Sequence, residues 1–151
     1  MNLSYSNYLK DNTDCPFCGD TNRILYESER CYITYALAPY HKHHLLVVPK
    51  KHKESIFKLS NDEKSDIDKI LIKSIKILNT LGYFDTAVIV REGPITQNGK
   101  VIGKTIRHLH YHVIPNTRIG DVDHKGITRY IMDEKTIDLI KNDIRKALKL
   151  L

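Results

Sequence analysis

The stretch His108-Leu109-His110-Tyr111-His112-Val113-Ile114-Pro115 carries three histidines that alternate with apolar or aromatic residues. Side chains along a β-strand point alternately to opposite faces of a sheet. Valine, isoleucine and tyrosine favour strands, and the proline gives the run a clean end. The alternation therefore predicts a strand over residues 105–114, with the three imidazoles on one face and an apolar face behind them. Imidazole can act as a base, a nucleophile or a metal ligand near neutral pH, so this face is the first candidate for chemistry.

Around this run the sequence predicts further strands and two helices. Short apolar runs bounded by turn residues predict strands at residues 24–26, 31–36, 45–48 and 84–90. Ser60 and Glu63 form a capping box in front of an apolar stripe at helical spacing, which predicts a helix over residues 60–81. Asp133 caps a second stripe and predicts a C-terminal helix over residues 133–150. Residues 1–14 are polar and expected to be loosely held, and residues 91–104 are expected to form a loop.

Length and composition limit the class of protein. A chain of 151 residues with 41% hydrophobic and 28% charged residues fits a single globular domain, residues 1–151. No apolar run approaches the roughly 20 residues of a membrane helix, and the first residues lack the apolar core of a signal peptide. We therefore expect a soluble, cytoplasmic protein without a membrane partner. The net charge of +6 suits an anionic substrate, although the lysines are spread along the chain as on an ordinary solvated surface, and we do not expect a nucleic-acid partner.

The cysteines and histidines suggest a second kind of chemistry. Cys15-Pro16-Phe17-Cys18 is typical of half a zinc site, because two thiolates at this spacing can reach one ion. A redox pair or two structural thiols would give the same pattern, and a zinc site needs two more ligands. The eight histidines fall into two clusters, residues 41–52 and 108–124, so the two segments are expected to meet. Taken singly, each of His41, His43 and His44 is expected to be a solvated loop histidine.

Taken together, these motifs resemble the histidine-triad (HIT) family of nucleotide hydrolases and transferases, in its zinc-binding branch. The family signature, His-φ-His-φ-His-φ-φ with φ apolar, stands here at residues 108–114. The segment from His44 to His52, His-Leu-Leu-Val-Val-Pro-Lys-Lys-His, is similar to the family's second landmark, and Cys15-Pro-Phe-Cys18 is similar to the zinc-binding members. The resemblance covers residues 15–118. It implies an α+β fold, an antiparallel sheet of about five strands with one long helix packed on it, and a homodimer; the C-terminal helix would be an addition.

The resemblance also implies a covalent mechanism. His110 would attack the α-phosphorus of a nucleotide and form a nucleotidyl-histidine, which water or another acceptor would release. His112 would support the ring of His110, and Thr105 would offer a hydroxyl to the phosphate oxygens. Arg91 and Lys104 stand where many members carry neutral residues, which favours a dinucleoside polyphosphate over a nucleoside phosphoramidate.

Several points depart from the family pattern or stay open. Ala36 stands where many members use Asp or Asn to hold the ribose. Carried over from zinc-binding members, the ligands of a structural zinc would be Cys15, Cys18, His52 and His108, which requires the strand to bend between His108 and His110. Four residues in the segment after the triad are candidates for covering the substrate site, but they are expected to be solvated: Asp121, Asp123, His124 and Arg129. A nucleotidyl transferase or phosphorylase, a non-catalytic zinc-stabilised nucleotide-binding module, and a protein with a transition metal on all three triad histidines are the alternatives.

Overall fold

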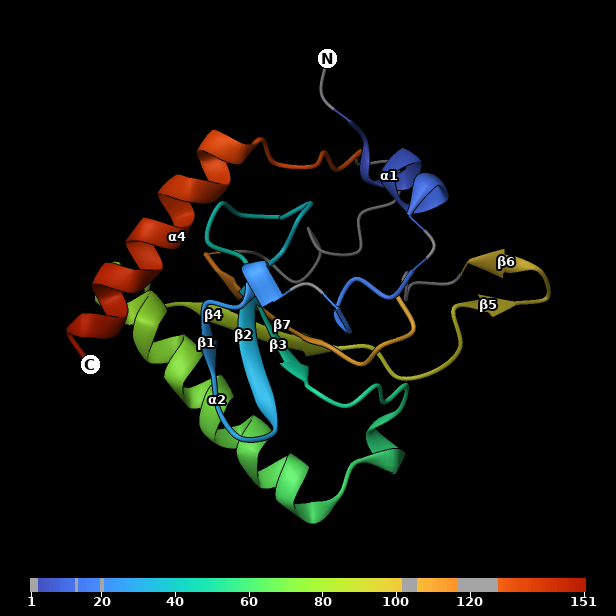
Figure 1. Ribbon diagram of the computed structural model, residues 1–151, viewed down its shortest axis with the longest axis horizontal. Coiled ribbons are helices and arrows are strands. Elements are labelled where there is room, and N and C mark those ends of the chain that lie inside the picture. Colours follow the sequence, from blue (N-terminus) through green and yellow to red (C-terminus); the bar gives the residue numbers. More distant parts are fainter. Residues whose placement is uncertain (1–2, 13, 20, 102–105, 117–127) are drawn as a thin grey trace.

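The centre of the molecule is an antiparallel sheet with the strand order β1-β2-β3-β7-β4 (Figure 1). The structure is a computed structural model that describes residues 3–12, 14–19, 21–101, 106–116 and 128–151. The strands of this sheet are β1 (Tyr26–Glu27), β2 (Cys31–Tyr35), β3 (Leu45–Pro49), β4 (Thr86–Val90) and β7 (Tyr111–Pro115). Each pair of neighbours is antiparallel, which confirms the predicted fold class.

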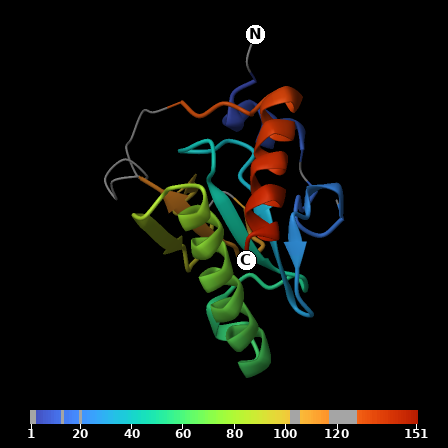
Figure 2. The same ribbon diagram turned by 90° about the vertical axis from the view of Figure 1, so that its left-hand side faces the viewer.

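Two long helices cover one face of this sheet, α2 (Asn61–Thr80) and α4 (Glu134–Lys149) (Figures 1 and 2). Ile33, Val47 and Val113 point to this face and are fully buried in the main core. On β2 and β3 the neighbouring residues point to the other face of the sheet. There Tyr32, Leu46 and Val48 form a smaller apolar cluster with Phe17. The sheet therefore has a structural face under the helices and a second face that is covered by the N-terminal part of the chain.

The helix boundaries follow the predicted capping residues. The Ser60 hydroxyl accepts a hydrogen bond from the Glu63 N–H at 3.1 Å, and the Glu63 carboxylate accepts one from the Ser60 N–H at 3.1 Å. Asp133 accepts from the Thr136 N–H at 2.7 Å at the start of α4. These contacts satisfy amide groups that would otherwise lack partners in the first turn. Both helices are thus confirmed, within one or two residues at each end.

The N-terminal residues form a helix, so the prediction of a loosely held segment was wrong. Helix α1 (Tyr5–Asp11) has Ser4 at its N-cap. It is fixed by long-range backbone contacts: the Tyr5 N–H donates to the Arg129 carbonyl at 2.8 Å, and the Ile131 N–H donates to the Leu3 carbonyl at 2.9 Å. A helix this short is marginal alone and needs such tertiary contacts.

The stretch 91–104, predicted as a loop, contains a small hairpin of β5 (Thr96–Gln97) and β6 (Lys100–Val101). Asn98 and Gly99 join its strands with positive φ angles of 52° and 74°, as an Asn-Gly hairpin turn requires. Two short 3₁₀ turns complete the described elements, η1 (Thr21–Arg23) and η2 (Ile56–Lys58). No helix in the described ranges is long and apolar enough to cross a membrane.

Candidate functional site

The three triad histidines do not share one strand. Strand β7 begins at Tyr111, so only His112 lies in it, whereas His108 and His110 precede it in non-strand backbone. The predicted strand start at residue 105 and the single row of imidazoles were therefore wrong. Strand β7 starts later than predicted because β3 pairs with it only from Leu45 to Val47. Beyond this point the Leu109 N–H donates to the Lys53 carbonyl at 2.6 Å, outside the ladder.

His108 turns toward the N-terminal cysteines. Its Nε2 lies 2.7 Å from the Pro49 carbonyl oxygen, which can only accept, so Nε2 carries the proton and Nδ1 keeps its lone pair. This Nδ1 lies 3.4 Å from the Sγ atoms of both Cys15 and Cys18. The side chain is fully buried. The ring is thus fixed in the tautomer that a metal ligand at Nδ1 needs.

His52 completes a four-ligand cluster. Its Nδ1 lies 3.2 Å from Cys18 Sγ, and the donor atoms of Cys15, Cys18, His52 and His108 lie within 4.8 Å of one another. Ligand atoms around a tetrahedral zinc are about 3.3–3.8 Å apart for bonds of about 2.0–2.3 Å, so the donor set and its spacing fit zinc. Burial and the neighbouring Cys15 thiol raise the pKa of Cys18 to about 11, a cost to the thiolate that a divalent cation would offset. The structure brings together all four predicted metal ligands.

His110 is held by a backbone carbonyl of the same segment. Its Nδ1 lies 2.8 Å from the His108 carbonyl oxygen, so Nδ1 carries the proton and Nε2 keeps its lone pair. Its ring packs against Phe17, with 5.2 Å between the ring centroids, and lies 4.9 Å from the ring of His112. His110 thus presents an unprotonated nitrogen, which is what a nucleophile requires.

His112 is fixed by His44 through a chain of hydrogen bonds. The Tyr40 N–H donates to Nδ1 of His44 at 3.2 Å, so the proton of a neutral His44 lies on Nε2. Nε2 of His44 lies 2.9 Å from Nδ1 of His112 and donates to it, which leaves the His112 proton on Nε2. Burial lowers the pKa of His44 to about 3, and burial holds that of His112 well below its ordinary value, so both rings are neutral. His112 therefore offers a proton donor beside the lone pair of His110.

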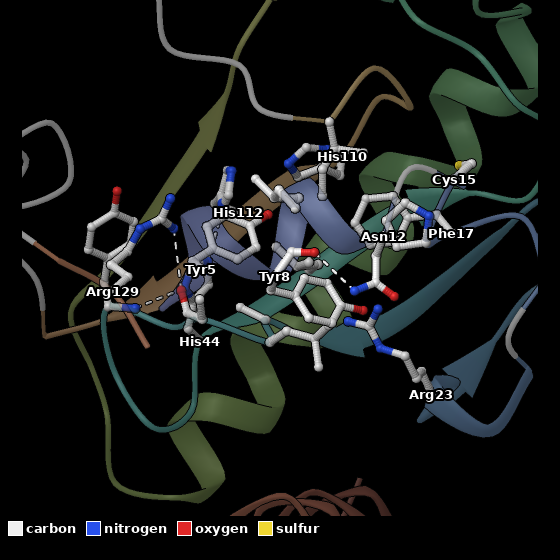
Figure 3. A pocket seen from close by; sticks show the side chains of 18 of the residues that line it. Tyr5, Tyr8, Asn12, Cys15, Phe17, Arg23, His44, His110, His112 and Arg129 are labelled. Atoms are coloured by element: carbon white, nitrogen blue, oxygen red, sulfur yellow. Dashed lines mark hydrogen bonds between the residues drawn. The ribbon is translucent and has the colours of Figure 1, made fainter. Parts of the chain in front are cut away.

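His110 and His112 line a cavity of about 300 Å³, within the size range of small-molecule clefts (Figure 3). One end lies around the aromatic ring of Phe17, with Asn12 and Arg23 on the same side, and the Arg23 guanidinium is 5.9 Å from the Phe17 ring centroid. At the other end Tyr5 and Arg129 lie beside His44 and His112 (Figure 3). The cavity thus has two ends of different chemistry, with His110 on its wall.

Two of the residues that the sequence analysis singled out around the substrate can be placed. Arg91 lines the cavity, and so does Ala36, which has no polar side-chain atom to offer a ribose. Thr105 and Lys104 lie outside the described residues, as do Asp121, Asp123 and His124.

Sequence reasoning missed several groups of this site. His44 is 1% exposed and His43 is 4% exposed, so the expectation that they are solvated was wrong. His43 lies 2.8 Å from an Asp143 carboxylate oxygen and 2.9 Å from the Tyr83 hydroxyl, which ties α4 to the loop before β3. Arg129, also expected to be solvated, lines the cavity. The clustering of the histidines in residues 41–52 and 108–124 indicated that the two segments meet, but it did not indicate the individual partners, because the contacts join distant parts of the chain.

The comparisons with known proteins identify the family of this chain. The HIT domain model matches residues 20–119. The chain belongs to the HIT family. A HIT-like protein of Methanocaldococcus jannaschii is 36% identical over 140 residues, which cover 89% of this chain and 98% of that protein. A histidine triad nucleotide-binding protein of Sulfolobus tokodaii has a solved structure with a TM-score of 0.68 and 25% identity, covering 91% of this chain and 93% of that one.

Relatives with named activities include two kinds of hydrolase. The adenosine 5′-monophosphoramidase of Schizosaccharomyces pombe is 29% identical over 113 residues, 75% of this chain and 78% of that protein. The bifunctional bis(5′-adenosyl)-triphosphatase/adenylylsulfatase of Arabidopsis thaliana is 27% identical over 140 residues, 89% of this chain and 74% of that protein. HIT proteins related to this chain thus include hydrolases of different nucleotide bonds.

Proposed function

We propose that this HIT protein is a nucleotide hydrolase that acts at the α-phosphate through a covalent nucleotidyl-histidine on His110. One observation carries the proposal: the bond between Nδ1 of His110 and the His108 carbonyl leaves the Nε2 lone pair on a ring that lines the cavity. A carbonyl partner fixes both the tautomer and the direction of the ring. Attack therefore needs no prior deprotonation of the nucleophile.

The reaction balances in two steps. In the first step, Nε2 of His110 forms a bond to the α-phosphorus while the bond from phosphorus to the leaving group breaks, and the leaving group departs with the electron pair. In the second step, water attacks the same phosphorus, the P–N bond breaks, and the nucleoside monophosphate leaves with His110 restored. Splitting one displacement into two is the usual gain from covalent catalysis. Phosphate in place of water would make the protein a phosphorylase, and the released product distinguishes the two.

Charge on the phosphate oxygens would be met by groups beside His110. His112, with its proton on Nε2, would donate to a non-bridging oxygen, a role different from the support of the His110 ring that the resemblance implies. Arg91 would bind the phosphate chain from the cavity wall. From the sequence pattern, Thr105 would add a hydroxyl donor and Lys104 a positive charge. This set favours dinucleoside polyphosphates as substrates, with nucleoside phosphoramidates as the alternative.

We also propose a structural zinc, held by Cys15, Cys18, His52 and His108. Two thiolates and two imidazoles fill a tetrahedral site and leave no position for substrate, so the ion would not take part in the reaction. It would tie the N-terminal turn to the segment that carries His110. Phe17, which lies between the two cysteines, packs on His110, so this tie would also shape the cavity.

A homodimer is the expected assembly, and β4 offers a surface for it. Strand β4 is at the edge of the sheet, and Val88 on it is 42% exposed. Phe84 just before it is 82% exposed, and Ile72 on α2 is exposed as well. Exposed apolar side chains at an open edge are typical of an interface. Light scattering should give twice the mass of the 17.5 kDa chain, and Val88→Lys should shift it toward the monomer; a wild-type monomer at micromolar concentration would contradict the proposal.

Trapping the covalent intermediate tests the catalytic proposal. The protein is mixed with diadenosine tetraphosphate, denatured without acid, and its intact mass is measured. We expect one added adenosine monophosphate on the wild type and none on His110→Ala. His41→Asn is the matched control, because His41 does not line the cavity and asparagine keeps an acceptor for the His43 N–H. Turnover without any adduct, or an adduct that survives in His110→Ala, would overturn the mechanism.

A further inference from the structure

Arg129 lies beyond the part of the chain that the HIT model matches, yet it lines the cavity. The Arg129 carbonyl accepts from the Tyr5 N–H at 2.8 Å, Tyr130 forms a β-bridge with Ser4, and the Met132 N–H donates to the Leu37 carbonyl at 2.9 Å. The segment is thus fixed on one side to α1 and on the other to the end of β2. Its position does not depend on a ligand.

The guanidinium of Arg129 is held without losing its charge. Its Cζ lies 4.8 Å from the ring centroid of Tyr5 and 4.6 Å from that of Tyr40, and its Nη1 donates to the Ala38 carbonyl at 3.3 Å (Figure 3 shows it beside Tyr5). Cation–π contacts orient a cation but do not neutralise it. Among the described residues, no carboxylate forms an ion pair with Arg129. Its positive charge is therefore available to an anionic ligand.

This charge lies at the end of the cavity opposite to Phe17. The positive charge of Arg129 contributes to lowering the pKa of both His44 and His112, so it acts at close range on this pair. Because both rings are neutral, Arg129 and Arg91 supply the positive charge at this end. The Phe17 ring at the other end offers a face on which a nucleobase could stack, beside the polar groups of Asn12 and Arg23. A substrate with its α-phosphate at His110 and its nucleoside at Phe17 would extend its remaining phosphates toward Arg129.

We propose that Arg129 binds the phosphates beyond the one that His110 attacks, and so selects nucleotides with a polyphosphate leaving group. The inference rests on the proposed function, since it assumes attack by His110 at the α-phosphate. It assigns to the C-terminal segment a role in substrate selection. A phosphoramidate has only a small leaving group and would gain little from Arg129.

Kinetics with two substrates test this selection. Arg129→Gln should lower kcat/KM for diadenosine tetraphosphate about 10- to 100-fold, the usual loss of a charge-assisted hydrogen bond, and that for adenosine phosphoramidate less than about threefold. Arg129→Lys should recover part of the loss, because lysine keeps the charge. Arg145→Gln is the control, since Arg145 is exposed on α4 and does not line the cavity. An equal loss for both substrates would mean that Arg129 only holds the fold, and no loss for either would mean that it does not contact substrate; both results overturn the proposal.

A binding measurement separates this inference from the catalytic proposal. Inorganic tripolyphosphate is titrated calorimetrically into the wild type and into Arg129→Gln. We expect the variant to bind at least about tenfold more weakly. Weaker binding without any His110 adduct would leave the subsite standing and remove the mechanism. Equal affinity, together with an intact His110 adduct, would remove the subsite and leave the mechanism standing.

Discussion

His108 and His110 are two residues apart, yet they belong to sites of different chemistry. Nε2 of His108 is bound to the Pro49 carbonyl, which leaves Nδ1 to face the thiols of Cys15 and Cys18. In His110 the arrangement is reversed: Nδ1 is bound to the His108 carbonyl, and Nε2 keeps the lone pair. The carbonyl partner of each ring therefore separates the proposed metal ligand from the proposed nucleophile.

This difference also explains why the two sites can coexist. The proposed metal site has four ligands from three segments of the chain, and one of its two histidines, His108, is fully buried. His110 and His112 are supported by hydrogen bonds and ring contacts, and they line a cavity. We therefore expect the first site to act mainly on stability and the second mainly on activity, with Phe17 as the contact between them.

The largest expected effect comes from His110→Ala. Loss of a covalent nucleophile should lower kcat/KM roughly 10⁴-fold, as in other enzymes with a covalent intermediate. Zinc content and melting temperature should stay at the wild-type level, because His110 is not part of the metal cluster. Steady-state kinetics, metal analysis and calorimetry on one preparation measure all three. Loss of zinc in this variant would show that the two sites are not separate.

The next effect concerns the metal cluster. Replacing both Cys15 and Cys18 by serine should remove about one zinc per chain and lower the free energy of unfolding by about 3–5 kcal/mol, because metal binding is coupled to folding. Metal analysis and urea unfolding measure the two quantities. Cys31→Ser is the matched control, because Cys31 is a buried cysteine outside the cluster. The zinc content of this variant should equal that of the wild type. Wild-type protein prepared without chelator that contains no zinc would refute the assignment.

Part of this comparison is visible in the sequence. Hydrophobic periodicity and the Ser60/Glu63 capping box predict the helices because these signals act within one or two turns. The Cys-x-x-Cys spacing and the triad motif indicate the metal ligands and His110. The orientation of His108 does not follow from any local pattern, since it depends on the carbonyl of Pro49 in a distant segment. The carbonyl that binds His110 is local, but it is in position only because the backbone leaves the strand before Tyr111.

The missed residues have the same physical cause. His44 binds His112 because the register of β3 and β7 places Leu46 opposite His112, a pairing of residues 66 positions apart (112 minus 46). Helix α1 had a local signal in Ser4 and the spacing of Tyr5 and Tyr8, but its stability comes from the segment around Arg129. Long-range pairing thus placed the groups that sequence reasoning treated as solvated.

The pH dependence of stability should report on the hydrogen-bonded pair. The pKa of His44 is about 3 in the folded protein, against an ordinary value of 6.5. Between these values the unfolded chain binds more protons, so stability that is present above about pH 6.5 is lost as the pH falls. For His44 alone the loss from pH 7 to pH 5 is about 2 kcal/mol. Urea unfolding in excess zinc should show a shallower slope for His44→Asn than for the wild type; equal slopes would mean that His44 is not held neutral.

The smallest effect concerns the outer contact of the metal cluster. Nε2 of His52 lies 3.4 Å from a Glu54 carboxylate oxygen, and both side chains are about half exposed. With Nδ1 of His52 toward the metal, Nε2 carries a proton for this carboxylate, which makes the ring a stronger ligand. Because solvent screens the contact, Glu54→Gln should weaken zinc binding by no more than about tenfold, the low end for outer contacts of this kind. Competition with a chromophoric chelator measures the affinity, and Glu29→Gln, whose carboxylate pairs with Arg30, is the control. If Glu54→Gln weakened zinc binding as much as His52→Ala does, the carboxylate would itself be a ligand. The proposed zinc site would then have a fifth metal-binding group beside its four ligands, and its contrast with His110 and His112, which hydrogen bonds hold in place, would change accordingly.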